Sequence, residues 1–305
     1  FRVVVDSRDK RTEFTPQFVK DAGAKGFMNK GKWSPYSDDS VFQKYYTKFV
    51  KALAKDFNDP SKVEFIDGFG LGKWGEYHTM IYSTGDDTPK KAVFDWVTDI
   101  YSQAFDKVPV VINYHRWIGA GKDWVDDEHF AADSEEMLEE AIKKGYSLRH
   151  DAFGMTTYYG SWERRFAKKY RNICPIIMEG GWIVKSHSYW QDPRGYRKDS
   201  HEDVRRGEFD DSKEAHVNMM DFRFGDTESW FKDAFDLVRR FLREGGYRLY
   251  PSEISLPLEV SKKTTPTIKH CWNNMGWGYC PTNIPQWNQK YKVAFALLDS
   301  ETNEV

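Results

Sequence analysis

The sequence predicts an α/β fold with a parallel β-sheet at its core, followed by a region built of β-strands alone. Apolar runs alternate with helical patterns along residues 1–246, and repeated strand–helix alternation gives parallel strands joined by crossover helices. From Tyr247 onward, YRLYPSEISLPLEV and YKVAFALLDS show β alternation without helices. We therefore expect a first domain over residues 1–246 and a β-sandwich domain over residues 247–305. We expect both to be incomplete, because the chain opens inside an apolar strand and closes on a turn.

Six short runs have the character of strands. They are rich in Val, Ile and Phe, and several are almost continuously apolar, as expected for strands buried on both faces. The six runs are Phe1–Ser7, Val63–Gly70, Val108–His115, Tyr146–Gly154, Cys174–Gly180 and His216–Arg223. Six such units fit either an open, doubly wound sheet or part of an eight-stranded barrel. GFGLGKWG at 68–75 is a weak match to a dinucleotide-binding loop, because no helix begins after it.

Helical patterns separate these strands, and several carry start or stop signals. Thr88-Pro89 places Pro at a first helical position, Asp133 with Glu136 resembles a capping box, and Gly145 marks a stop. The expected helices cover residues 38–57, 88–101, 133–144, 161–170 and 227–244.

Polar side chains follow the carboxyl end of every predicted strand, which is where barrels place their chemistry. In strand order they are Asp6 and Arg8; Trp74, Glu76 and His78; Asn113, His115 and Arg116; Arg149, His150 and Asp151; Glu179 and Trp182; and Asp221 and Arg223. Any one of them also fits ordinary strand termination. Together they predict one lined cleft with Glu76 and Glu179 as catalytic groups. The substrate-binding candidates are Asp6, Arg8, Trp74, His78, Asn113, His115, Asp151, Trp182, Asp221 and Arg223.

Two glutamates carry the sharpest signals. Glu179 follows Pro-Ile-Ile-Met and precedes two glycines. Burying a carboxylate after such an apolar run is costly unless the carboxylate is paired or takes part in function. Glu76 lies among aromatic residues. An ion pair with Arg149 or Arg223 is the structural alternative for Glu179, and an N-cap or salt bridge is the alternative for Glu76. Two carboxyl groups suit glycoside hydrolysis, in which one protonates the leaving oxygen and the other attacks the anomeric carbon or activates water.

Composition argues against some partners and is compatible with a carbohydrate substrate, although its many aromatic residues also fit a large core. The 45 basic and 47 acidic residues argue against a nucleic-acid partner, and no apolar run approaches the roughly 18 residues that span a bilayer. The sequence lacks an HExxH motif, so we expect neither metal nor cofactor. Aromatic residues make up 16% of the chain, including 12 Trp, and such rings stack on sugar faces. Three cysteines form no disulfide framework, and pairing of Cys271 with Cys280 stays open.

Three segments carry a family resemblance: FTPQFV, FIDGFGLGKWGEYH and CWNNMGWGYCP. They are similar to bacterial proteins that join a (β/α)8 barrel to a C-terminal β-sandwich domain of unknown function. More broadly, the chain resembles the clan of (β/α)8 glycoside hydrolases with the acid/base after strand 4 and the nucleophile after strand 7. The resemblance implies a TIM-type barrel of which strands 3–8 are visible, a retaining glycosidase with Glu76 as acid/base and Glu179 as nucleophile, and a secreted or periplasmic location.

One residue departs from the clan. Most members have Asn directly before the acid/base, where it holds the sugar 2-hydroxyl, and here that position is Gly75. Asn113 or His115 would then have to supply the contact. The competing readings are a catalytically silent carbohydrate-binding barrel and an open-sheet nucleotide-binding protein. A retaining enzyme would place its two carboxyl groups roughly 5–5.5 Å apart.

Overall fold

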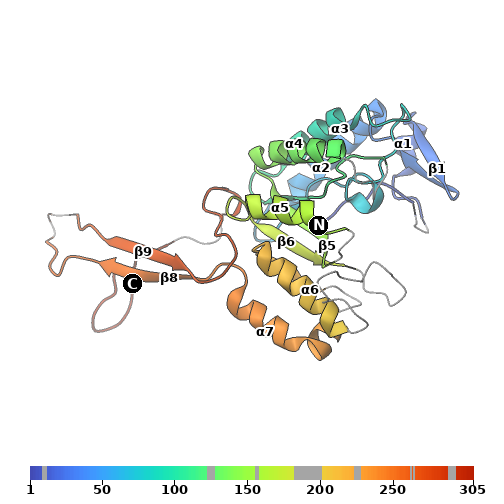
Figure 1. The fold of residues 1–305 in the computed structure, drawn as a ribbon. Helices are drawn as coiled ribbons and strands as arrows, with labels where there is room; N and C mark the ends of the chain where they lie inside the picture. The colour runs from blue at the N-terminus through green and yellow to red at the C-terminus, as the bar shows by residue number, and fades with distance from the viewer. Residues whose placement is uncertain are drawn as a thin grey trace.

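The computed structural model shows a mixed α/β protein with a projecting β-hairpin (Figure 1). The structure describes residues 1–8, 12–121, 128–154, 158–181, 201–222, 228–261, 263, 265–287 and 293–305. Among the helices described, none is long and apolar enough to cross a bilayer.

The core of the molecule is a five-stranded parallel sheet with strands in sequence order. The strands are β3 (Ile66–Asp67), β4 (Val110–Asn113), β5 (Ser147–Phe153), β6 (Ile176–Gly180) and β7 (Met219–Asp221). The predicted parallel sheet is therefore confirmed for five of the six runs. The first predicted strand runs beside β3 but pairs with it only through a parallel bridge between Arg2 and Asp67.

The sheet is curled into a half-barrel. Arg2 lies at the β3 edge, yet its guanidinium contacts Glu179 on β6 at 2.8 Å. Arg149 on β5 likewise contacts Asp67 on β3 at 3.4 Å. Neighbouring strands are spaced by about 4.8 Å, so in a flat sheet β3 and β6 would lie roughly 14 Å apart, too far for these contacts. The curl brings side chains from four parts of the sheet into one interior.

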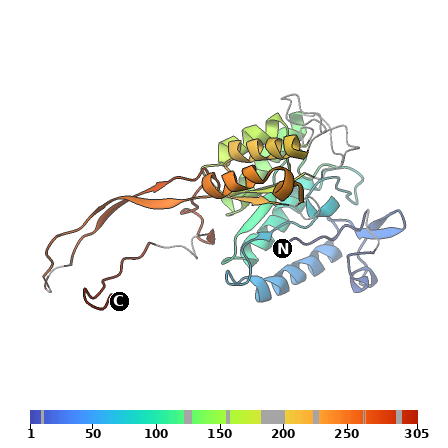
Figure 2. The same ribbon diagram turned by 90° about the horizontal axis from the view of Figure 1, so that it is seen from below.

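Helices pack around the outside of the curled sheet (Figure 2). The main ones are α2 (Ser40–Phe57), α3 (Lys90–Ala104), α4 (Glu128–Lys143), α5 (Ser161–Tyr170), α6 (His201–Glu214) and α7 (Phe235–Glu244), with a short α1 (Gln17–Asp21) and a π-helical turn, Ser229–Asp233. Because successive strands are neighbours, crossovers of one hand place their helices on one face of the sheet. The other face is thereby left for the interior of the half-barrel.

Three helix assignments differ from the prediction. The helix predicted over 227–244 begins as α7 only at Phe235, after the π-helical turn Ser229–Asp233. Helix α4 begins at Glu128, so the predicted start at Asp133 is wrong; Asp133 lies inside the helix, and its carboxylate pairs with Lys90 Nζ at 2.7 Å. Helix α6 was not predicted. Its buried face carries the polar side chains Arg205, Glu208, Asp211 and Ser212, each at most 1% exposed. An apolar stripe at helical spacing is therefore lacking. The predicted stop at Gly145 is confirmed by its positive φ of 95°.

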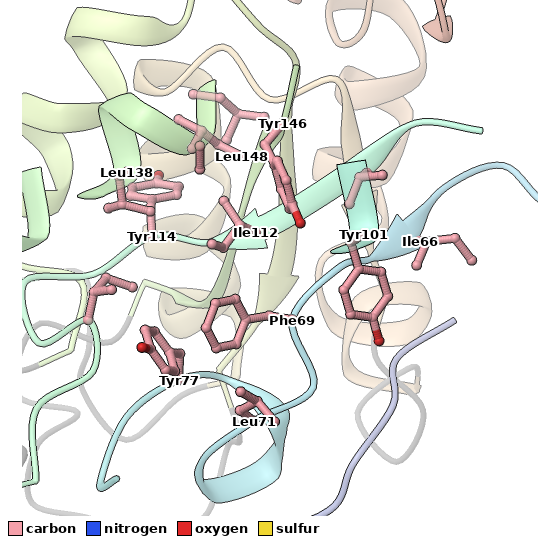
Figure 3. Close-up of a cluster of buried hydrophobic side chains, with 14 of the residues drawn as sticks. Ile66, Phe69, Leu71, Tyr77, Tyr101, Ile112, Tyr114, Leu138, Tyr146 and Leu148 are labelled. Atoms are coloured by element: carbon pink, nitrogen blue, oxygen red, sulfur yellow. The ribbon is translucent and has the colours of Figure 1, made fainter. Parts of the chain in front are cut away.

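The apolar core fixes the segment that follows β3 (Figure 3). Several core tyrosines end in hydrogen bonds to backbone carbonyls of this segment. Tyr46 donates to Phe69 O at 2.9 Å, and Tyr146 donates to Gly68 O at 2.9 Å. The path of the chain from β3 toward Glu76 is therefore set by the core.

The C-terminal region contains the antiparallel hairpin β8 (Leu249–Ser255) and β9 (Lys269–Asn274), and a second hairpin, β1 (Gly26–Asn29) and β2 (Lys32–Pro35), lies near the N-terminus. Figure 2 shows β8 and β9 projecting from the body, and both strands are exposed along their whole length. The β character predicted after Tyr247 is present as the hairpin β8–β9, whereas residues 293–300 of the predicted strand YKVAFALLDS form no strand. Cys271 and Cys280 are both free thiols.

Candidate active site

The loop that carries Glu76 is strained. Trp74, Tyr77 and Thr79 have positive φ angles of 56°, 60° and 50°, a region that non-glycine residues rarely adopt. Each such residue costs on the order of 1–3 kcal/mol and persists only where its surroundings enforce it. Here the Tyr77 hydroxyl is buried and donates to Lys90 O at 2.9 Å. Backbone strain of this kind clusters at functional sites.

Gly75 is required by the close approach of another chain segment. Its φ is +78°, and a Cβ atom at this position would lie 2.6 Å from Val3 O. No side chain fits there without moving the first strand. An Asn at position 75 is therefore excluded by steric clash in this structure.

Two arginines join the two candidate catalytic carboxyl groups. Arg2 donates from Nη1 to Glu76 Oε1 at 2.6 Å and from Nη2 to Glu179 Oε2 at 2.8 Å. Arg149 Nη2 contacts the same Glu76 oxygen at 3.5 Å and also hydrogen-bonds Glu179 Oε2. Two oxygens that share one donor nitrogen at hydrogen-bonding range are separated by at most about 6 Å. The two cations favour the charged form of Glu179.

Asp67 on β3 contacts both arginines. Its Oδ2 accepts from Arg2 Nε at 2.8 Å and lies 3.4 Å from Arg149 Nε. Burial raises the pKa of Asp67 to about 6, and the Arg2 charge works in the opposite direction. This carboxyl group sets the direction in which both guanidinium groups point.

Glu76 forms a buried acid pair with Asp151. The two side chains share a hydrogen bond, and Asn113 Nδ2 donates to Asp151 Oδ1 at 3.2 Å. Burial raises the pKa of Glu76 well above its usual value, and the adjacent Asp151 charge raises it further. Burial also opposes ionisation of Asp151, but the hydrogen bond from Glu76 and the nearby histidines lower its pKa overall. These opposite shifts favour protonation of Glu76 over protonation of Asp151.

Histidines enclose this acid pair. His115 Nε2 donates to Glu76 O at 2.9 Å, while its Nδ1 accepts from Trp117 N at 3.2 Å, so the ring is neutral. His78 Nε2 lies 3.4 Å from Glu76 Oε2. Burial lowers the pKa of His150 to about 3. These rings shape the pocket of Glu76, and no metal-binding group of three or more His, Cys, Asp or Glu side chains exists among the described residues.

The remaining predicted residues fall in different places. Asp6 and Arg8 pair with each other at 2.7 Å, and Arg8 Nη2 donates to Thr79 O at 2.6 Å. This pair therefore supports the backbone of the loop that carries Glu76. Asp221 on β7 is exposed and lies opposite Glu179 in the strand register. Trp74 is 41% exposed. The predicted residues Trp182 and Arg223 lie outside the described residues.

Two members of the site were not predicted, Arg2 and Asp67. Each is a charged residue inside an apolar strand, in FRVVV and EFIDGFG. The reasoning that singled out Glu179 applies to both, because a charge in a buried strand needs a partner.

The geometry brings together one carboxyl group with a raised pKa, one carboxylate held by two cations and a further acid–amide pair. Such an arrangement can protonate a leaving group and attack or stabilise a developing cation. Comparison of the chain with family models, with curated proteins and with solved structures found no match.

Proposed function

We propose that this protein is a retaining glycoside hydrolase with Glu179 as nucleophile and Glu76 as general acid/base. The observation that supports this is the contrast between two neighbouring carboxyl groups. Burial and Asp151 raise the pKa of Glu76 although Arg2 also contacts it, whereas Glu179 is less buried and is held by Arg2 and Arg149. Environments that push two carboxyl groups toward opposite protonation states mark the acid and the nucleophile of this chemistry.

The reaction proceeds in two displacements. The Glu179 carboxylate attacks the anomeric carbon while the glycosidic C–O bond breaks, and Glu76 gives its proton to the departing oxygen. Glu76 then takes a proton from water, which attacks the glycosyl–enzyme bond and releases Glu179. Oε1 of Glu76 and Oε2 of Glu179 contact Arg2.

The sugar 2-hydroxyl needs a partner other than residue 75. Asn113 is the candidate that suits this role, because its amide donates to Asp151 while its Oδ1 is buried without a hydrogen-bond partner among the described residues. His115 suits it less, because its Nε2–H is engaged with Glu76 O. The exposed ring of Trp74 supplies a stacking surface beside Glu76.

The finer architecture is part of the same proposal. Residues 1–7 and strands β3 to β7 correspond to strands 3–8 of a (β/α)8 barrel, and β8 and β9 to the first strands of a β-sandwich. The curl of the sheet supports the barrel, because an open sheet would not bring β3 and β6 into contact with one guanidinium group. A secreted or periplasmic bacterial enzyme acting on plant or microbial glycans fits this architecture.

A catalytically silent carbohydrate-binding barrel is the second candidate. Its favouring observation is that the Arg2 guanidinium contacts both carboxyl groups at once and so lies between them. The hydrolase requires the sugar to bind beside this guanidinium or to displace it. A silent binding protein has no such requirement.

A panel of aryl glycosides separates the two candidates. The hydrolase should release the aryl group from at least one sugar, with retention of configuration by NMR of the first-formed product. Glu179→Gln should abolish that turnover while keeping the melting temperature within a few degrees. Binding of sugars by calorimetry without turnover of any panel member would favour the silent barrel.

A further inference from the structure

A buried glutamate on α6 holds the backbone that follows Glu179. Glu208 is 1% exposed, and its Oε1 accepts from Gly181 N at 3.0 Å. The preceding residue, Gly180, lies so close that an added Cβ would be 3.0 Å from the same oxygen. At the end of β5, a Cβ on Gly154 would lie 2.4 Å from Glu208 Cγ and 3.0 Å from its Cα. Glu208 is thus wedged between the ends of β5 and β6.

The second oxygen of Glu208 is fixed as well. Its Oε2 pairs with Arg205 Nη1 at 2.5 Å, and Arg205 is fully buried. The Arg205 guanidinium also donates to Ser229 Oγ at 2.9 and 2.7 Å and lies over the Trp230 ring. A carboxylate anchored at both oxygens cannot rotate, so the position of the Gly181 amide is fixed with it.

We propose that Glu208 is a positioning residue that orients the Glu179 carboxylate by clamping the end of β6. Two glycines at 180 and 181 leave the chain after Glu179 without side chains of its own to lock it. The clamp from α6 takes over this task. Strand β5 carries Asp151 and strand β6 carries Glu179. Glu208 therefore positions the carboxyl-terminal ends of the strands that carry both acids. The kinetic consequence rests on the proposed hydrolase function, whereas the structural consequence does not.

Kinetics of two Glu208 variants test the first consequence. Glu208→Ala removes the clamp, and Glu208→Gln keeps its size but breaks the ion pair with Arg205. Misplacement by about 1 Å costs on the order of 100-fold in rate, so we expect about a 100-fold loss of kcat for Glu208→Ala and about 10-fold for Glu208→Gln, with KM changed less than about threefold. The loss should be the same for aryl glycosides with good and poor leaving groups, because nucleophile placement affects both.

A matched control lies one helical turn away. Asp211 on α6 is also fully buried and pairs with Arg164 at 3.1 Å, but this pair faces α5. Asp211→Asn should lower the melting temperature and leave kcat within about twofold. An equal loss of kcat in Asp211→Asn and Glu208→Gln at equal loss of stability would overturn the proposal, because it would reduce Glu208 to a general contributor to folding.

Crystal structures of the wild-type protein and Glu208→Ala test the second consequence without any substrate. The proposal requires the Glu179 carboxylate to leave Arg149 and Arg2 in the variant. Retention of both contacts would overturn it. Should Glu208→Ala fail to fold, Glu208→Met, which keeps the length but cannot replace the carboxylate as acceptor for Gly181 N, is the variant to crystallise, with the same two outcomes. Absence of turnover by the wild-type protein would overturn only the hydrolase proposal. The crystal structures would still decide the role of Glu208.

Discussion

Arg2 and Glu179 lie 177 positions apart in the chain, and Arg2 Nη2 donates a 2.8 Å hydrogen bond to Glu179 Oε2. The same guanidinium reaches Asp67 and Glu76 through its other two nitrogens. One side chain from the edge of the sheet therefore ties three acids from β3, its following loop and β6 into one network. This network is what makes the interior of the half-barrel a candidate active site.

Arg2→Lys should damage this network although the charge is kept. A lysine ammonium is a single point charge, so it cannot replace a planar group that contacts three carboxyl groups in fixed directions. We expect a loss of kcat of at least about tenfold on aryl glycosides, which corresponds to about 1.4 kcal/mol in the activation barrier. Lys44→Arg on the outer helix α2 is the control and should leave kcat unchanged. Unchanged kcat in Arg2→Lys would show that Arg2 is not needed by the reaction.

Glu76→Gln should depend on the leaving group. Aryl glycosides with poor leaving groups need the proton from Glu76 and should lose on the order of 100-fold or more, whereas those with good leaving groups should lose much less. Burial and Asp151 raise the pKa of Glu76, so wild-type activity should fall as pH rises through a value above the usual glutamate range. This basic limb of kcat/KM should disappear in Glu76→Gln. Equal losses across all leaving groups would remove Glu76 from the acid role.

His150 should make the protein sensitive to mild acid. Its folded-state pKa is lowered to about 3 by burial, against about 6.5 when unfolded, so the unfolded chain binds a proton that the folded one does not. The free energy of unfolding should therefore fall as pH drops below about 6.5, by about 2 kcal/mol at pH 5 from this residue. Urea unfolding of His150→Asn should show a shallower pH dependence by that amount. His270→Asn on the exposed β9 should change nothing, and an identical slope in all three proteins would contradict the prediction.

Gly75→Ala should be more destabilising than Gly85→Ala. Both glycines have nearly the same positive φ, +78° and +81°, so the backbone strain introduced by alanine is alike. Only Gly75 has a neighbour in the way, with Val3 O at 2.6 Å from the added Cβ, whereas nothing lies within 4 Å of it at Gly85. We expect an excess cost of roughly 1–3 kcal/mol for Gly75→Ala in denaturant unfolding. Equal costs would mean that residues 1–7 do not pack against the loop as the structure shows.

The parallel sheet could be predicted because its strands are encoded locally. A run such as CPIIMEG is apolar over a strand length, and the chain alternates such runs with helical patterns, so strand order follows from the short crossovers. Helix α6 could not be predicted, because its buried side includes Arg205, Glu208 and Asp211 rather than an apolar stripe. Besides the Arg205–Glu208 pair, their burial depends on partners from α5, Gly181 and residue 229, which no local pattern contains.

The sequence by itself determined which residues carry charge into the sheet. A charged side chain inside or directly after an apolar strand must be paired or take part in function. This rule singles out Glu179 and applies equally to Arg2 and Asp67. Only the tertiary structure decided which charges meet. In a flat sheet, β3 and β6 would lie roughly 14 Å apart. The curl of the sheet is what brings the Arg2 guanidinium within 2.8 Å of the Glu179 carboxylate. The raised pKa of Glu76 also depends on the fold, because the hydrogen bond with Asp151 and the loss of water exist only in the folded interior.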